Sequence, residues 1–229
     1  LSQIWSKFPR LIRDVSNECG KQVNLVQDGE DTELDRTLLD AIRDPLVHII
    51  RNCIDHGIET PEQRAHLGKP ATGQVLLKAS HENGMVVIQI ADDGGGIDFD
   101  LVCQKAIEKK LLTAEHALTL TDMQLLEYIF LPGFSTKSVV TNLSGRGVGM
   151  DVVRNNLQAI GGTIELENYE GHGLKITLRL PLTLSIIAGL SVRAGAQIFG
   201  IARSSVVEMV STSNANVKFE ELGGRKIVS

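Results

Sequence analysis

Two histidines, an amide and a carboxylate fall on one face of a predicted helix. Asp44 as N-cap, Pro45 in the first helical position and Gly57 as a stop predict one helix over residues 44–57. At ~100° per residue, its polar side chains share one arc of ~140°. These side chains are His48, Arg51, Asn52, Asp55 and His56. They include ligand-binding and proton-transfer types, although a solvated amphipathic helix would give the same pattern.

A second chemical signal is the acid at the end of an apolar strand. Residues 86–90 are apolar or neutral, and they lead into Asp92, Asp93 and three glycines at 94–96. Such a turn offers a fixed carboxylate beside backbone that a flat ring can approach closely. Because a carboxylate accepts a hydrogen bond from an exocyclic amino group, Asp92 would favour adenine over guanine. A simple surface turn is the alternative.

A third signal is a glycine-rich segment before a predicted helix. Gly145, Gly147 and Gly149 leave successive backbone N–H groups open, and the helix N-terminus after them adds partial positive charge. This combination suits a polyphosphate, whereas a flexible connector is the alternative. The spacing does not match the dinucleotide fingerprint GxGxxG, and the chain has no GxxxxGK[ST] run.

The elements that must position these residues alternate between helical and strand patterns. The predicted helices cover residues 1–19, 44–57, 99–110, 122–130 and 150–160. The predicted strands cover residues 22–26, 73–80, 85–91, 163–168 and 174–180. Strands 73–80 and 85–91 form a hairpin around the turn residues Glu82-Asn83-Gly84. The fold class is therefore α+β, a two-layer α/β sandwich with helices on one face of a mixed or antiparallel sheet.

The pattern of predicted secondary structure changes after Pro181. Short β-type runs follow at 184–192, 197–201 and 206–210, which predict the start of a small all-β module. We therefore expect a first domain over residues 1–183 and part of a second over 184–229.

Bulk composition excludes several classes of protein. A net charge of -5 and a pI near 5.7 argue against nucleic-acid and anionic-membrane surfaces. No apolar stretch approaches the ~18 residues of a membrane span. The three cysteines show no CxxC spacing, which predicts free thiols and a cytoplasmic protein. The chain does not begin with Met, so we expect a piece of a longer protein.

Four segments together resemble a known superfamily. In chain order, residues 48–59, 92–98, 131–137 and 144–153 resemble the N, G1, F and G2 boxes of the GHKL ATPases. The sequences of these motifs are similar to those of the chemotaxis histidine kinases of the CheA family, since most sensor kinases have Glu at the position of His48. Residues 8–11 and 180–184 resemble the start and the exit of that family's catalytic domain, and the tail resembles its CheW-like, SH3-like regulatory domain.

The resemblance implies a Bergerat-type ATP-binding fold and a protein-histidine kinase of two-component signalling. Such a kinase binds Mg-ATP and transfers the γ-phosphate to a histidine on a separate phosphotransfer domain. Asp92 would hold the adenine amino group, while Gly94 and Gly96 would let the ring lie against the backbone.

The same resemblance implies the phosphate and metal contacts. His48 and Asn52 would be catalytic: Asn52 would coordinate Mg²⁺, and His48 would order the γ-phosphate or accept a proton. His56 would donate to a phosphate. The other implied cofactor contacts are Asp55, Lys105, Ser135, Lys137, Gly145, Arg146, Gly147 and Gly149.

The resemblance also implies partners: a phosphotransfer domain, a CheW-like adaptor and chemoreceptors through the tail, and a downstream response regulator. The chain itself would be monomeric and its parent a homodimer. Two alternatives stay open. The domain could be a non-catalytic nucleotide-binding scaffold, or a GHKL ATPase that hydrolyses ATP with water, which typically uses Glu where this chain has His48. Leu174 and Gly95 depart from the family's usual residues.

Overall fold

The computed structural model describes residues 1–117, 119–134, 149–182, 189–195, 197–202, 206, 219–222 and 225–228. The chain divides into two compact units, Leu1–Ser185 and Ile186–Ser229. The assignment of the second unit to a CheW-like domain stays a prediction. Among the described residues, none of the helices combines the length and the apolar character that a bilayer crossing needs.

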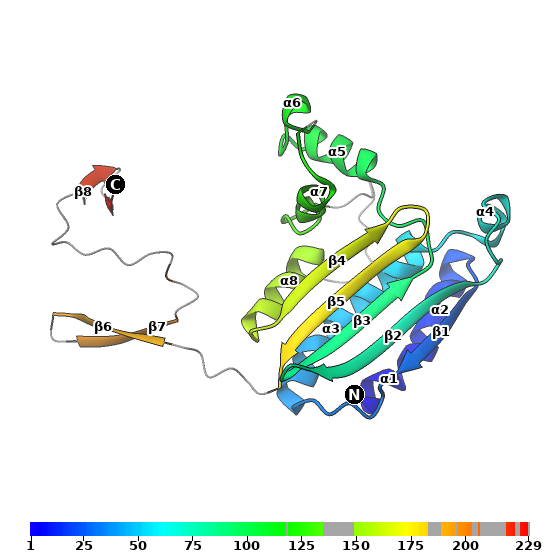
Figure 1. Ribbon diagram of the computed structural model, residues 1–229, viewed down its shortest axis with the longest axis horizontal. Coiled ribbons are helices and arrows are strands. Elements are labelled where there is room, and N and C mark those ends of the chain that lie inside the picture. Colours follow the sequence, from blue (N-terminus) through cyan, green and yellow to red (C-terminus); the bar gives the residue numbers. More distant parts are fainter. Residues whose placement is uncertain are drawn as a thin grey trace. The chain divides into compact units, whose positions relative to one another are not determined.

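A five-stranded sheet organises the first unit (Figure 1). Its strands, in spatial order, are β1 Val23–Asp28, β2 Gly73–Glu82, β3 Met85–Asp92, β5 Gly173–Pro181 and β4 Thr163–Tyr169. The pair β1 and β2 is parallel and the other pairs are antiparallel, so the sheet is mixed. The predicted hairpin is confirmed, because Asn83 and Gly84 both have positive φ and join β2 to β3 directly.

Helices cover one face of this sheet (Figure 1). They are α2 Phe8–Cys19, α3 Arg36–Asn52 and α8 Met150–Ala159. Buried apolar side chains of these helices meet those of the central strands, among them Ile49, Ile50 and Val153 against Ile88 and Leu178. The opposite sheet face carries cross-strand ion pairs. The predicted α+β sandwich is therefore confirmed.

The predicted helix over residues 1–19 is wrong in its middle. The structure has a short α1, Ser2–Trp5, before α2. Pro9 lacks the N–H that would donate to the Trp5 carbonyl in a continuous helix. That carbonyl instead accepts from Gln27 Nε2 at 3.0 Å. Gly20 ends α2 with φ 64°, as the sequence predicts.

The predicted start of the helix at Asp44 is also wrong. α3 begins at Arg36, and its N-cap is Asp35, whose carboxylate accepts from Thr37 N at 2.8 Å. Pro45 therefore lies inside the helix. Leu38 and Ile42 are fully buried, and they extend the apolar face of α3 toward its N-terminus. Burial of this face outweighs the hydrogen bond that Pro45 cannot make.

The end of this helix differs from the prediction as well. Residues Cys53–Gly57 form a π-helical turn, η1, in which Ile58 N donates to Cys53 O at 2.8 Å. The wider i→i+5 turn changes the angular positions of Asp55 and His56 relative to Asn52. The single α-helical face expected over residues 44–57 is thus correct only as far as Asn52.

A second, smaller group of helices has its own core. It comprises α5 Phe99–Glu108, α6 Ala114–Ala117 and α7 Asp122–Tyr128. Helices α5 and α7 match their predictions, and the Thr121–Gln124 capping box is present. Neither α6 nor α4, Pro61–His66, appears among the sequence predictions.

The described part of the second unit contains two pairs of strands. β6 Gly189–Ala194 pairs antiparallel with β7 Gln197–Ala202, and β8 Phe219–Leu222 pairs antiparallel with β9 Arg225–Val228. The runs predicted at 184–192 and 197–201 overlap β6 and β7. The run predicted at 206–210 lies outside the described residues except for Val206, which has no strand conformation.

Candidate functional site

Asp92 occupies the last position of β3 and is only 8% exposed. Its Oδ1 accepts a hydrogen bond from Gly94 N at 3.0 Å. Within the described part of the chain, its Oδ2 is buried and has no hydrogen-bond partner. Burial raises the pKa of this carboxyl above its ordinary value, against the opposing effects of the Gly94 N–H, the Cys53 thiol and the Leu174 N–H. A ligand N–H that reached Oδ2 would satisfy an atom that is costly to leave unpaired.

Close backbone approach around Asp92 depends on glycines from three segments. A Cβ on Gly94 would lie 2.0 Å from Gly57 O, and a Cβ on Gly57 would lie 2.9 Å from Asp92 Oδ2. Gly173 has φ 115°, and a Cβ there would lie 1.9 Å from Asp92 O. Gly95 N closes the arrangement by donating to Gly57 O at 3.0 Å. The end of the α3–η1 segment and the Asp92 loop are therefore in direct contact.

His48 and Asn52 lie one turn apart on α3 and contact each other. Asn52 Nδ2 lies 3.0 Å from His48 Nε2 and 3.7 Å from Met150 Sδ at the start of α8. Burial lowers the pKa of His48, with further lowering from His56 and Arg51 and an opposing effect of Asp151. A neutral imidazole can accept through Nε2, so Asn52 donates to it.

The side-chain oxygen of Asn52 is the atom that a metal ion would contact. Both side-chain hydrogen bonds that Asn52 forms with described residues use Nδ2, so its Oδ1 is bonded to none of them. The described residues include no group of three or more His, Cys, Asp or Glu side chains placed to hold a metal ion. A magnesium ion at Asn52 would therefore take most of its ligands from phosphates and water, as Mg²⁺ commonly does.

Asp55 and His56 belong to the π-helical turn. His56 Nε2 lies 3.5 Å from Asp55 Oδ2, and Cys19 Sγ lies 3.7 Å from Asp55 Oδ1. Lys21 Nζ donates to Ile54 O at 2.7 Å and to Asp55 O at 2.9 Å. The turn is thus stabilised from outside the motif, by a lysine at the start of the β1 segment.

The remaining predicted residues are placed in part. Gly149 is the N-cap of α8 and has an extended conformation. Lys105 lies on α5, where its Nζ forms a 2.9 Å ion pair with Glu108. Gly96 has φ 74°, and a Cβ there would lie 2.7 Å from Asn168 Oδ1. The other predicted contacts, Ser135, Lys137, Gly145, Arg146 and Gly147, lie outside the described residues.

Sequence reasoning missed a cluster of charged side chains around the Asp92 loop. The cluster consists of Glu59, Arg64, Lys69 and Asp93. Arg64 is fully buried and binds the Asp93 carboxylate through two nitrogens, at 3.2 and 2.8 Å. The only available signal was the second acid of the Asp-Asp pair, which has no obvious role beside Asp92.

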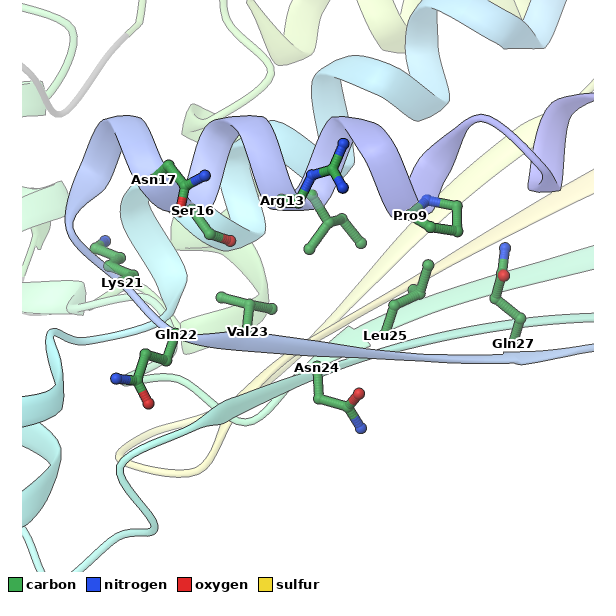
Figure 2. Close-up of a pocket in the computed structure, with 11 residues that line it drawn as sticks. Pro9, Arg13, Ser16, Asn17, Lys21, Gln22, Val23, Asn24, Leu25 and Gln27 are labelled. Carbon is green, nitrogen blue, oxygen red and sulfur yellow. The ribbon is translucent and has the colours of Figure 1, made fainter.

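A groove of about 430 Å³ lies elsewhere, between α2 and the edge strand β1 (Figure 2). Ile12, Arg13 and Ser16 line it from the helix, and Val23 and Leu25 line it from the strand. None of the predicted site residues lines this groove, so its size does not bear on the site built around Asp92.

Comparisons with known proteins identify the family of this chain. A family described as histidine kinase-, DNA gyrase B-, and HSP90-like ATPases matches residues 41–184. The chain is 45% identical over 222 residues to the chemotaxis protein CheA of Treponema pallidum, which covers 97% of this chain and 26% of that protein. It is 47% identical over 205 residues to CheA of Bacillus subtilis, which covers 90% of this chain and 30% of that protein.

Among solved structures, the histidine kinase domain of a blue-light activated kinase from Erythrobacter litoralis aligns with a TM-score of 0.45 and 14% identity, over 78% of this chain and 65% of that chain. The chain spans less than a third of the length of either CheA relative. Since the family match covers more than half of the chain, the chain belongs to the histidine kinase-, DNA gyrase B-, and HSP90-like ATPases, an ATP-binding family, and within it is similar to the CheA chemotaxis histidine kinases.

Proposed function

We propose that this domain binds Mg-ATP and transfers its γ-phosphate to a histidine on a separate phosphotransfer domain. The observation that carries the proposal is the hydrogen bond between Asn52 and His48, whose pKa burial lowers, on a helical segment whose end at Gly57 contacts the Asp92 loop. A hydrolytic enzyme needs a group that activates water, and the Nε2 lone pair of His48 is occupied by Asn52. The pair instead suits positioning and charge stabilisation, which are the main demands of phosphoryl transfer.

Asp92 is the proposed base-recognition residue. Its buried Oδ2 would accept from the adenine amino group, and the glycines at 94 and 96 would allow the close packing of the loop that holds this carboxylate. Guanine carries an oxygen at the equivalent ring position, so its lone pairs would face the carboxylate. Adenine would therefore be favoured.

Asn52 is the proposed metal contact, through Oδ1. Bound magnesium would neutralise charge on the phosphates. His48 would hold Asn52 in orientation and approach the γ-phosphate end, and His56 would donate to a phosphate. The other proposed cofactor contacts are Asp55, Lys105, Ser135, Lys137, Gly145, Arg146, Gly147 and Gly149.

The wider signalling role is also a proposal. By similarity to CheA, the parent protein would act in the cytoplasm as a homodimer and pass phosphate to a response regulator. The second unit would contact a CheW-like adaptor and chemoreceptors. The phosphoacceptor histidine would lie outside this chain.

The test follows labelled γ-phosphate from ATP. We expect the 229-residue chain, mixed with a separate phosphotransfer domain and Mg-ATP, to label a histidine of that domain. Asn52→Ala should abolish labelling, while the matched control Asn156→Ala, an exposed residue of α8, should not. Label appearing only as free phosphate would identify a hydrolase, and label remaining on ATP would identify a scaffold; either result overturns the proposal.

A further inference from the structure

The charged cluster around Asp93 is built on a fully buried arginine. Arg64 donates to Pro70 O at 2.6 Å through Nε and to Glu59 Oε2 at 3.0 Å. Its two terminal nitrogens bind the Asp93 carboxylate as a fork. Gly73 makes room for this side chain, because a Cβ there would lie 3.3 Å from Arg64 and 2.6 Å from Ile58. A buried guanidinium is stable only with such complete pairing.

Lys69 extends the cluster onto the loop backbone. Its Nζ donates to Glu59 Oε1 at 2.6 Å, to Gly94 O at 2.9 Å and to Asp93 O at 3.2 Å. Although burial acts in the opposite direction, the hydrogen bond from Lys69 lowers the pKa of Glu59. Two cations and two carboxylates balance in charge, so the effect of the cluster on its surroundings is geometric rather than electrostatic.

The cations of the cluster bind both backbone carbonyls of the two residues that follow Asp92, as well as the Asp93 carboxylate. The carbonyls of Asp93 and Gly94 accept from the cations, and the Asp93 carboxylate also accepts from Gln74 N at 2.8 Å. Gly94 N is then aimed at Asp92 Oδ1, and Gly95 N at Gly57 O. With these two N–H groups fixed, neither is directed at Asp92 Oδ2, which has no hydrogen-bond partner among the described residues.

We infer that Arg64 and Lys69 are positioning residues for base recognition: they hold the 93–94 backbone so that Asp92 Oδ2 is kept for a donor on the ligand. The inference rests on the proposed adenine role of Asp92. The ligand group it selects is an amino N–H on a purine ring. Glu59 joins both cations two residues after Gly57, so the same cluster also fixes the end of the Asn52 helix segment.

The test compares ATP with inosine triphosphate, which has an oxygen acceptor in place of the amino donor. For the wild-type chain we expect ATP to bind about tenfold tighter or more. Lys69→Met should reduce this affinity ratio about fivefold or more, because the loop donors become free to satisfy Oδ2. Lys69→Arg should keep most of the ratio. The matched control, Lys78→Met, removes an exposed lysine of β2 and should leave the ratio unchanged.

Lys69 is the first choice because its side chain is 16% exposed, so the Lys69→Met variant should fold, whereas Arg64→Met would leave partly buried carboxylate atoms unpaired. Equal weakening of both nucleotides, with the ratio unchanged, would show a merely structural role and overturn the inference. Asp92→Asn distinguishes a failure of the proposed base-recognition role of Asp92 from a failure of the positioning role of Lys69. If it leaves the wild-type ratio intact, the base-recognition role of Asp92 fails; if it abolishes the ratio and Lys69→Met does not change it, only the positioning inference fails.

Discussion

Replacing Gly94 by alanine tests the close packing of the Asp92 loop. The added Cβ would lie 2.0 Å from Gly57 O, 2.3 Å from Gly57 C and 2.8 Å from Ile58 N. All three are backbone atoms, so no side chain can rotate away. Cβ contacts below 3.0 Å essentially do not occur in proteins, so the two backbones must separate by about 1 Å. Such overpacking costs about 1–3 kcal/mol, and loss of the Gly95 N to Gly57 O bond adds about 1 kcal/mol.

The neighbouring Gly95 provides a matched control. A Cβ on Gly95 has only Glu59 Oε1 nearby, at 3.7 Å, which is an ordinary contact. Its conversion to alanine should change the free energy of unfolding by less than about 1 kcal/mol, with a gain possible through the unfolded chain. The same substitution is therefore expected to be clearly destabilising at Gly94 and close to neutral at Gly95.

Two assays measure the effect. Urea unfolding should place the midpoint of Gly94→Ala below that of Gly95→Ala, with similar slopes. Titration with a fluorescent ATP analogue should show about tenfold weaker binding for Gly94→Ala, because separation from Gly57 moves the Gly94 N–H off Asp92 Oδ1. Equal midpoints for the two variants, or a larger loss in Gly95→Ala, would refute the packing argument.

Two further predictions concern α3. Burial lowers the pKa of His48 below its ordinary value of 6.5. The stabilising hydrogen bond between His48 and Asn52 should therefore be fully formed above pH 6.5 and lost as the pH falls through the lowered pKa. NMR titration of the imidazole measures this pKa, and a value above 6.5 would contradict the prediction. Asp35→Ala should lower the free energy of unfolding by about 1 kcal/mol through loss of the N-cap, whereas the exposed Asp40→Ala should cost less than about 0.5 kcal/mol in the same urea experiment.

Features encoded by local chemistry could be predicted from the sequence. Asn83 and Gly84 adopt positive φ with little strain, so the position of the hairpin turn could be predicted. Thr121 and Gln124 form a capping box, so the start of α7 could be predicted as well. The four motifs also led to the CheA family, which the comparisons confirm. The prediction of the start of α3 was wrong because Pro45 is typical of a first helical turn, while Leu38 and Ile42 become buried only in the folded chain.

Some residues of the candidate site could likewise be predicted from the sequence, and others could not. Asp92, His48 and Asn52 belong to residue patterns that carry their own chemical meaning. The π-helical turn could not be predicted, because Lys21 stabilises its carbonyls from 33 and 34 positions away. Arg64 gave no signal either, since an arginine in a short helix is ordinarily solvated and only the folded chain buries it against Asp93.

The position of Asp92 connects the fold's stability with the proposed recognition of adenine. Along β3, Val86, Ile88 and Ile90 alternate toward the helical layer and are fully buried, and Asp92 is the next residue in the same period. The pattern that builds the core therefore also draws a carboxylate into it, and burial raises the pKa of that carboxyl. The folded domain thus carries an unfavourable buried oxygen before any ligand arrives. A purine amino group would relieve it, so binding would draw on free energy stored by folding. A loop free to supply its own donor would remove that advantage, which is the physical reason for a buried arginine beside the acid.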